Sequence, residues 1–435
     1  MTEPVVTDTA LPDAPVPRVI VVAEHASLRF GGEAALPVHY FAGLRRRGVE
    51  AWLVVHARTR DELTAALPDD LARMHFLPDT AINRLAWRLS RYLPAQINYF
   101  TLGYISRIAT QLAARRVVRD LVRRQGATVV HQPIPVSPRE PSLLWRMGAP
   151  VVIGPMNGNM SYPPAFRGSV RGQGVIGRIL TAARLLSRPL HGLMPGKLRA
   201  VLLLVANPRT RAGLPAGARG EVVELVENGV DLDLWQAAAP QLQVRGNGPA
   251  RFVFMGRLVD WKAVDILLEA MVAMADTTAT LDIIGDGDRR PALEAQARAL
   301  GLDGRVRFAG WLSQADCSAR LAAADALVLP SIYECGGAVV LEAMACARPV
   351  IATDWGGPAD YLTADCGMLI APESRAAMVS GFAAAMDRLA ADPPLREALG
   401  RAGRQRVESE YSWARKIDTI LGLYARAMAI APRGR

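Results

Sequence analysis

The chain has 435 residues, of which 51% are hydrophobic and 21% are charged, and its formal net charge is +10. This length exceeds what one compact core normally holds, so we expect two domains of roughly 200 residues each. No segment has the roughly 18 to 20 apolar residues of a spanning helix and the four cysteines show no metal-type spacing, which argues against an integral membrane protein and favours a reduced, cytoplasmic one.

The chain begins with an acidic, proline-rich segment, residues 1–17. It lacks the charged leader and apolar run of a signal peptide, so we interpret it as a disordered tail. Short β-branched runs then alternate with longer helical patterns, and near-continuous apolar runs of this kind indicate parallel strands covered on both faces. The expected strands are 18–24, 50–57, 127–133, 149–155 and 200–207 in the first half, and 250–258, 279–287, 304–311, 325–331 and 348–354 in the second.

The positive charge is concentrated in the first half. Residues 80–119 contain seven arginines and no acidic residue, and residues 167–199 contain six arginines and Lys197, again without an acid. As a helix, residues 176–188 would separate an apolar side from three arginines, which is typical of a helix on an anionic bilayer but also of an ordinary surface helix. Nucleic acid is disfavoured as a partner, because the basic stretches lack regular aromatic interleaving.

Two sets of strands predict an α/β protein with two doubly wound domains. The stretch "VENGVDLDLW", residues 226–235, is the natural junction. We expect one Rossmann-like domain over 18–225, a second over 226–410, and a final helix over 411–435. Ligands of such sheets bind beyond the carboxyl ends of the strands, so the loops there are where chemistry is expected.

Two glutamates flank a glycine pair after the expected strand 325–331. Glu334 lies in the loop, Gly336 and Gly337 follow, and Glu342 falls in the second turn of the next helix. Free amides at a helix start form an anion site, and glycine lets a phosphate approach the backbone. Carboxylates on both sides could accept hydrogen bonds from hydroxyls, so the arrangement predicts a nucleotide-sugar site. Either glutamate alone would be typical of a cap or a helix surface.

Two cations stand near the end of the expected strand 250–258. Arg257 and Lys262 can both aim at one pyrophosphate, and each charge-assisted contact contributes about 1.5 to 3 kcal/mol when desolvated. Singly, each would be typical of a surface charge. The glycine-rich turn at Gly285 resembles a dinucleotide fingerprint only superficially, because Arg290 occupies the third glycine position. We interpret it as a turn near the nucleoside.

These motifs together resemble the carboxyl-terminal half of a family 4 glycosyltransferase. They are "NGVD", "GRLVDWK", "IIGDG", "VRFAGWL", "DALVLPS", the Glu334 to Glu342 pair with "LEAMA", and "CGMLIAP". The stretch "FGGEAALPVHYFAGLRRRGVEAWLVV" resembles the family's glycine-rich loop and first helix. The resemblance implies a GT-B architecture: two Rossmann-like parallel-sheet domains facing across a cleft, with the last helix crossing back to the first domain. It also implies transfer with retention of configuration and without a metal or other cofactor.

The resemblance assigns roles residue by residue. Arg257 and Lys262 would neutralise the leaving diphosphate in place of a metal. Glu342 would hold the ribose, and Glu334 would meet hydroxyls of the sugar. His131 matches a histidine that the family often keeps near the anomeric carbon, although it could also simply satisfy a strand end. The other residues of the predicted donor site are Gly31, Gly32, Gly256, Gly285, Trp311, Leu312, Gly336, Gly337, Ala338 and Val339.

One position departs from the family pattern: Gly336 stands where an aromatic residue is usual, which alters how sugar and base are gripped. We expect a retaining hexosyltransferase with a lipid-linked or membrane-proximal acceptor in cell-envelope or exopolysaccharide assembly, peripheral to the inner face of the cytoplasmic membrane. A soluble small-molecule acceptor and a catalytically silent nucleotide-sugar binder are the alternatives. A nicotinamide oxidoreductase is disfavoured, because the loop after the first strand lacks three spaced glycines.

Overall fold

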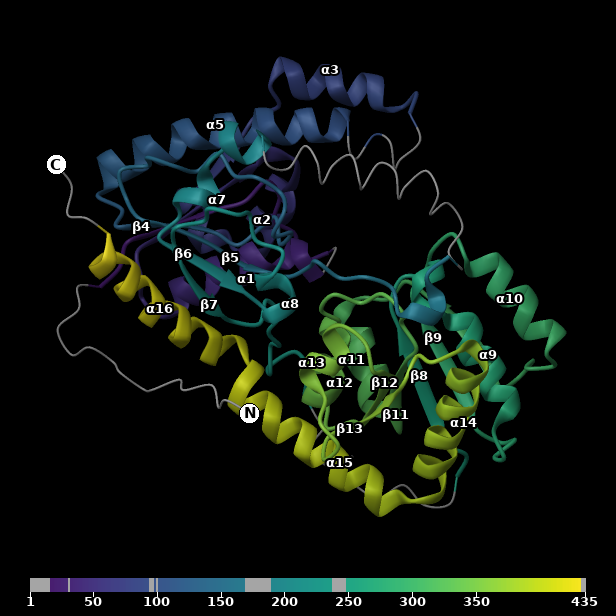
Figure 1. Cartoon of the computed structure of the whole chain (residues 1–435). Coiled ribbons are helices and arrows are strands. Elements are labelled where there is room, and N and C mark those ends of the chain that lie inside the picture. The colour runs from purple at the N-terminus through teal and green to yellow at the C-terminus, as the bar shows by residue number, and fades with distance from the viewer. Residues whose placement is uncertain are drawn as a thin grey trace. The chain divides into compact units, whose positions relative to one another are not determined.

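The computed structural model describes residues 16–29, 32–93, 98, 101–168, 189–236 and 248–431. The chain divides into two compact units, each built on one sheet (Figure 1). The first comprises Met1–Asn159, Leu180–Glu227 and Lys416–Arg435, and the second comprises Met160–Ile179 and Asn228–Arg415. The helix expected over 176–188 and residues 1–15 of the expected tail lie outside the described residues.

The first unit contains a seven-stranded parallel sheet in the order β3-β2-β1-β4-β5-β6-β7. Its strands are β1 (Val19–Val22), β2 (Ala51–His56), β3 (Met74–Leu77), β4 (Val129–Gln132), β5 (Val151–Met156), β6 (Leu202–Val205) and β7 (Glu221–Glu224). The five inner strands coincide with the expected runs and are fully buried. The edge strands β3 and β7 were not expected, because an edge strand is only partly buried and needs no apolar run.

Helices cover the sheet of the first unit. They are α1 (Gly32–Arg46), α2 (Arg60–Ala66), α3 (Ala81–Ser90), α5 (Leu102–Gln125), α7 (Gly196–Arg199) and α8 (Pro208–Arg211), with short 3-10 turns η1 (Ala57–Thr59) and η2 (Pro68–Arg73). Val118 and Leu121 of α5 share a buried core with Ile20, Val130 and Ile153 of the sheet. The apolar stripe of α5 therefore covers one face of the central strands.

The last helix, α16 (Trp413–Ile430), belongs to the first unit from Lys416 onward. Its Tyr424 hydroxyl lies 2.7 Å from Nδ1 of His131, and Asp418 pairs with Arg47 at 2.8 Å. Buried hydrogen bonds and exposed ion pairs, among them Arg426 with Glu221 at 2.6 Å, thus attach α16 to the first unit.

The second unit contains a six-stranded parallel sheet in the order β10-β9-β8-β11-β12-β13. Its strands are β8 (Arg251–Met255), β9 (Thr280–Ile284), β10 (Val306–Gly310), β11 (Ala326–Leu329), β12 (Val350–Thr353) and β13 (Gly367–Ile370). The helical elements are η3 (Pro164–Phe166), η4 (Asp260–Lys262), α9 (Val264–Ala273), α10 (Arg290–Ala299), α11 (Gln314–Ala323), α12 (Ala338–Ala345), α13 (Gly357–Tyr361), α14 (Arg375–Ala391), α15 (Pro393–Arg406) and η5 (Val407–Tyr411). Only the edge strand β13 was not expected.

Each sheet reverses its strand order at one point. In the first unit this point lies between β1 and β4, and in the second it lies between β8 and β11. Adjacent loops leave in opposite directions there and open a crevice at the carboxyl ends of the strands. The predicted site residues on the loops after β8 and β11 therefore lie where proteins of this fold class bind ligands.

Gly285 allows the ends of two strands to approach closely. Its φ is +130°, and a Cβ there would lie 2.0 Å from the carbonyl oxygen of Gly256. We expect Gly285→Ala to destabilise the second unit by about 1 to 3 kcal/mol, because the backbone would have to shift or strain. Thermal denaturation measures this as a lowered midpoint.

The matched control is Gly422→Ala on α16, where a Cβ would meet nothing within 4 Å. This change should be neutral or stabilise by up to about 1 kcal/mol, because alanine favours a helix over glycine. Equal midpoints for the two variants would contradict the close approach at Gly285.

Candidate active site

The loops after β8 and β11 are joined by an ion pair. Nζ of Lys262 contacts a carboxylate oxygen of Glu334, and the two side chains are only 14% and 16% exposed. The amide of Ile332 also donates to the carbonyl of Trp261 at 2.9 Å. The structure thus brings together two of the residues predicted from the sequence, and it does so in a partly desolvated place where charge interactions are strong.

Arg257 adds a second cation beside this pair. It follows Gly256 directly at the end of β8, and its side chain is exposed. A Cβ at Gly256 would lie 3.6 Å from Nζ of Lys262, so the ammonium group lies close over the glycine backbone. Within the described part of the chain, no hydrogen bond or ion pair engages the Arg257 guanidinium. Its positive charge is therefore available to an anion.

The start of α12 presents open backbone amides. Gly337 precedes the helix with φ +83°, and the amides of Gly337, Ala338 and Val339 have no acceptor among the described residues. The first amides of any helix lack intrahelical partners and favour an anion. The Glu334 side chain lies against Gly337, where a Cβ would come within 3.0 Å of its Cγ. The predicted phosphate cradle and the predicted hydroxyl acceptor are therefore neighbours.

Gly336 serves a packing role that the sequence did not indicate. A Cβ at Gly357, the first residue of α13, would lie 1.9 Å from the Gly336 carbonyl oxygen. The Gly357 amide also donates to the Glu334 carbonyl at 2.8 Å. The loop from Glu334 to Gly337 is thus fixed from behind by backbone contacts with α13, which holds the open amides in place.

Glu342 lies in the second turn of α12 and is partly buried. Burial raises the pKa of its carboxyl group to about 7. No hydrogen bond or ion pair to this carboxylate is found within the described ranges. An acceptor with an elevated pKa and no protein partner is suited to bind hydroxyl groups of a ligand.

The remaining predicted residues of this unit lie at the ends of β9 and β10. The Gly285 amide donates to the Gly310 carbonyl at 2.8 Å, and the Gly256 amide donates to the Ile284 carbonyl at 3.0 Å. Trp311 follows β10 and is 63% exposed, and Leu312 is partly buried beside it. These backbone bonds align three strand ends in one row, with an exposed indole at its end.

His131 lies in the first unit, on β4, and is completely buried. Its Nε2 lies 2.6 Å from the Gly154 carbonyl, and its Nδ1 lies 2.7 Å from the Tyr424 hydroxyl. Burial lowers the pKa of the ring to about 4. Both ring nitrogens are therefore engaged within the protein, and the geometry gives His131 a structural role. The catalytic role stays a prediction.

The glycine-rich loop of the first unit is only partly described. Gly32 begins α1 with φ +49°, and a Cβ there would meet nothing within 4 Å. Gly31 lies outside the described residues. The backbone at Gly32 is therefore of the kind that favours glycine, while its predicted contact with a donor stays a prediction.

A buried charge cluster in the first unit was missed from the sequence. Lys197 is fully buried, donates to the Ser137 carbonyl and has its pKa lowered to about 7 by burial. Arg107 and Glu140 pair at 3.0 Å nearby, and burial raises the pKa of Glu24 to about 8. Glu24 lies two residues after the end of β1, where the sequence could have indicated a site residue. Lys197 stands in an arginine-rich run, where a lysine is typical of a surface charge.

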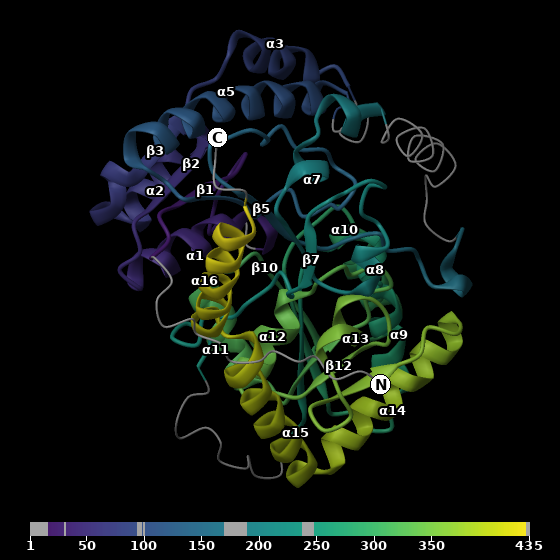
Figure 2. The same cartoon turned by 60° about the vertical axis from the view of Figure 1, so that its left-hand side comes forward.

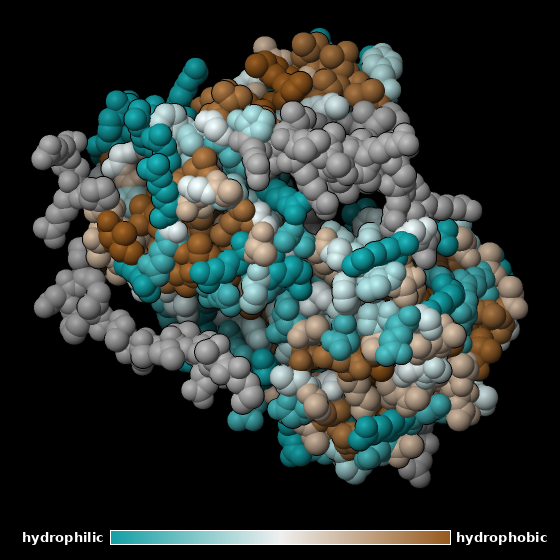
Figure 3. Space-filling model, in the orientation of Figure 1, coloured by the Kyte–Doolittle hydropathy of each residue, from teal (hydrophilic) through white to brown (hydrophobic). Residues whose placement is uncertain are grey.

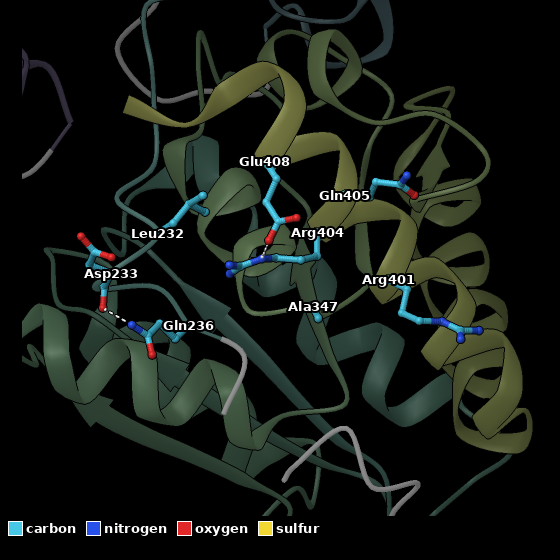
Figure 4. A pocket seen from close by; sticks show the side chains of 8 residues that line it. All are labelled: Leu232, Asp233, Gln236, Ala347, Arg401, Arg404, Gln405 and Glu408. Atoms are coloured by element: carbon cyan, nitrogen blue, oxygen red, sulfur yellow. Dashed lines mark hydrogen bonds and ion pairs between the residues drawn. The ribbon is translucent and has the colours of Figure 1, made fainter. Parts of the chain in front are cut away.

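A separate pocket of the second unit lies at the other end of α12 (Figure 4). It is lined by Leu232, Asp233, Gln236, Ala347, Arg401, Arg404, Gln405 and Glu408. Arg404 donates to the carbonyls of Ala345 and Trp235 and pairs with Glu408. It therefore caps the carboxyl end of α12. No predicted donor residue lines this pocket.

Within the described ranges, no helix is long and apolar enough to cross a bilayer. In the same ranges, no cluster of three or more histidine, cysteine, aspartate or glutamate side chains could hold a metal ion. None of the four cysteines, all of which lie in the described ranges, forms a disulfide.

Residues 239–406 match the family model of the glycosyl transferases group 1. This range contains the whole sheet of the second unit and every predicted donor residue from Gly256 to Glu342. The predicted resemblance is therefore confirmed for this part of the chain.

Curated relatives match 39% to 49% of the chain. A "Glycogen synthase" of Mycobacterium tuberculosis (strain CDC 1551 / Oshkosh) is 33% identical over 215 residues, which are 49% of this chain and 49% of that protein. The "Lipopolysaccharide core biosynthesis glycosyltransferase LpsE" of Rhizobium meliloti (strain 1021) is 36% identical over 171 residues, 39% of this chain and 48% of that protein. The chain spans about half the length of the curated relatives it matches.

The fold matches solved structures over nearly the whole chain, whereas the sequence matches curated relatives over about half of it. The structure of a sucrose-phosphate synthase from Thermosynechococcus elongatus matches with a TM-score of 0.67 and 19% identity, over 95% of this chain and 100% of that chain. The predicted fold class, GT-B with two Rossmann-like parallel-sheet domains, is confirmed.

The raised pKa of Glu342 predicts how stability depends on pH. The folded protein holds this proton up to about pH 7, whereas the unfolded chain releases it near 4.5, so the group costs stability as the pH rises between these values. We expect Glu342→Gln to raise the thermal midpoint relative to the wild type, and to do so more at about pH 8 than at about pH 5.

Glu373→Gln is the control for this prediction, because Glu373 is an exposed glutamate of the same unit. It should shift the midpoint little at either pH. If Glu342→Gln shifted the thermal midpoint equally at both pH values, this would contradict a raised pKa of the Glu342 carboxyl group in the folded protein.

Proposed function

We propose that this protein is a retaining, metal-independent hexosyltransferase that moves a sugar from a nucleotide diphosphate donor to a lipid-linked or membrane-proximal acceptor. The observation that carries the proposal is the convergence of three features at the ends of β8 and β11: the Lys262–Glu334 pair, the exposed Arg257, and the open amides before α12. The match of this unit to the glycosyl transferases group 1 supports the reaction class.

The donor is proposed to lie along the first turns of α12. Its diphosphate accepts from the amides of Gly337, Ala338 and Val339, and its ribose hydroxyls donate to Glu342. Glu342 is five residues beyond Gly337, which corresponds to about 7.5 Å along a helix at 1.5 Å per residue. This spacing is close to the distance between a pyrophosphate and the ribose attached to it. Trp311 and Leu312 then provide apolar surface for the base.

The Lys262–Glu334 pair provides a way to bind both parts of the donor. Without a ligand, each charge satisfies the other in a partly buried place. We propose that the diphosphate takes over the Lys262 ammonium while sugar hydroxyls take over the Glu334 carboxylate. Neither charge is then left unpaired in either state, which avoids the large penalty of an isolated buried ion.

Leaving-group stabilisation is proposed to dominate the chemistry. The bond between the anomeric carbon and the diphosphate oxygen breaks, and the diphosphate gains negative charge as it departs. Lys262, Arg257 and the amides before α12 are aimed at where that charge develops, which is the most effective use of fixed charges in an enzyme. These cations replace the metal ion that other transferases require, so turnover should continue in the presence of a chelator.

We propose that the acceptor binds to the first unit, at the carboxyl ends of its central strands. Glu24 lies just beyond the carboxyl end of β1 and is partly exposed, so we propose that it accepts from hydroxyls of the glycan. The Arg107–Glu140 pair and the fully buried Lys197 support this position from inside the unit. The similarity to a lipopolysaccharide core glycosyltransferase supports a lipid-linked glycan in cell-envelope or exopolysaccharide assembly. The arginine-rich segments of this unit support a position against an anionic membrane surface.

Two variants of the ion pair test the assigned roles. Lys262→Ala removes the contact with the leaving group, and we expect it to lower release of nucleoside diphosphate from the nucleotide sugar by about a hundredfold or more. It should also weaken binding of the nucleoside diphosphate itself. Glu334→Gln should bind the nucleoside diphosphate as well as the wild type or better, because the change frees the Lys262 ammonium group and removes a negative charge near the diphosphate. Its turnover should still fall, because the carboxylate that accepts from the sugar hydroxyls is lost.

The control is Arg401→Ala, which removes an exposed cation of the same unit from the pocket of Figure 4. Its turnover should match that of the wild type. Near-normal turnover in Lys262→Ala would contradict the proposed role of this residue in stabilising the leaving diphosphate. Equal loss of diphosphate binding in both ion-pair variants would mean that the pair acts only on the structure. Retention is tested by the anomeric configuration of the product, and an inverted product would remove that part of the proposal.

A further inference from the structure

Helix α3 packs on α5 through a small, polar face. Asn83 and Ala86 are its buried residues, and the Asn83 amide donates to the Ser106 hydroxyl at 2.7 Å and to the Thr110 hydroxyl at 3.1 Å. Figure 1 and Figure 2 both show α3 lying along α5. Hydrogen bonds, rather than an apolar stripe, therefore hold α3 on the first unit.

The large apolar side chains of α3 and the turn after it are directed to solvent. A surface helix normally buries such residues, whereas α3 exposes them together with its arginines. The brown patch at the top of Figure 3 lies over this helix. Its members and their exposed fractions are Ile82 52%, Leu85 58%, Trp87 71%, Leu89 43%, Tyr92 71% and Leu93 36%. Ile82, Leu85 and Leu89 share one side of α3 by helical spacing, whereas Trp87 projects from another side. Exposed apolar side chains gathered in this way mark an interaction site.

Three arginines lie among these apolar side chains. Arg84 donates to the backbone carbonyl of Asp79 at 2.6 Å, and Arg91 donates to the Tyr92 hydroxyl at 2.9 Å. Among the described residues, no carboxylate pairs with Arg84, Arg88 or Arg91. The described residues therefore do not neutralise their positive charge, and the surface is suited to an anionic partner.

We propose that α3 and the following turn, residues 81–93, are an in-plane anchor that inserts into the interface of a bilayer containing anionic lipid. The leucines and isoleucine reach the acyl boundary, Trp87 and Tyr92 suit the headgroup level, and the arginines contact lipid phosphates. A helix of 10 residues is about 15 Å long, which is half of a hydrocarbon core, so α3 lies on the membrane and does not cross it.

A second copy of the chain fits this surface less well. A two-fold contact would place the same patch on both sides, so the three arginines would meet three identical arginines without an acid from residues 81–93. Like charges facing each other in a desolvated contact are unfavourable. A lipid surface removes this conflict, because it supplies phosphates beside acyl chains.

Vesicle co-sedimentation of the full chain tests the anchor. We expect binding to phosphatidylcholine vesicles that contain phosphatidylglycerol, little binding to phosphatidylcholine alone, and weaker binding at about 0.5 M salt because of screening. The variant Leu85→Ser/Trp87→Ser/Leu89→Ser should lose binding at least tenfold. Because all three side chains are exposed, the variant should unfold at the same temperature as the wild type.

Leu71→Ser/Leu193→Ser is the matched control, since it removes two exposed leucines elsewhere in the same unit and should bind vesicles normally. Equal vesicle binding by the α3 variant and the wild type would overturn the proposal. So would absence of wild-type binding at low salt, or a dimer in sedimentation velocity that the α3 variant lacks.

The anchor is argued independently of the donor site, although it would bring a lipid-linked acceptor within reach. The membrane anchor and the donor site can be tested independently of each other. The α3 variant should bind nucleoside diphosphate normally, and Lys262→Ala should bind vesicles normally. Loss of vesicle binding in both variants would indicate a general defect and would count against the anchor.

Discussion

The ion pair between Lys262 and Glu334 joins two loops that are 72 positions apart in the sequence. It depends on one constraint: the strands β8 and β11 are parallel neighbours, so the loops after them leave from the same edge of the sheet. Strand order alone thus converts distant sequence positions into one charged centre. The start of α12 then adds open amides to this centre, because α12 follows the same loop.

Close backbone contacts hold the centre in place. Gly285 lies against Gly256, and Gly357 lies against Gly336, at distances that leave no room for a side chain. These contacts fix the loops from behind, so the side chains that face a ligand need little reordering on binding. Such preorganisation is what makes fixed charges and dipoles effective in stabilising a developing negative charge.

The sequence predicted the central strands, and it placed the candidate residues of the second unit on loops that the structure brings to neighbouring strand ends. It missed features whose burial does not appear as an apolar pattern. The edge strands β3, β7 and β13 are only four residues long and partly exposed, so none of them forms a long, fully buried apolar run. The pairing of Lys262 with Glu334 was not foreseen, because each had been assigned to a different part of the donor. The sequence places Lys197 in a basic run that is typical of an exposed surface, whereas tertiary packing buries it completely. The sequence also did not show that the large apolar side chains of α3 are exposed, because periodicity defines an apolar face but not whether that face meets the core or solvent.

The measurement that tests the central claim most directly is calorimetric titration of the purified protein with UDP, GDP and ADP in the presence of a chelator. The account predicts micromolar binding of one of these without metal, and weakening of that binding in Lys262→Ala but not in Glu334→Gln. Absence of binding by all three would contradict it, because the open amides before α12, Arg257 and Lys262 would then not form a diphosphate site.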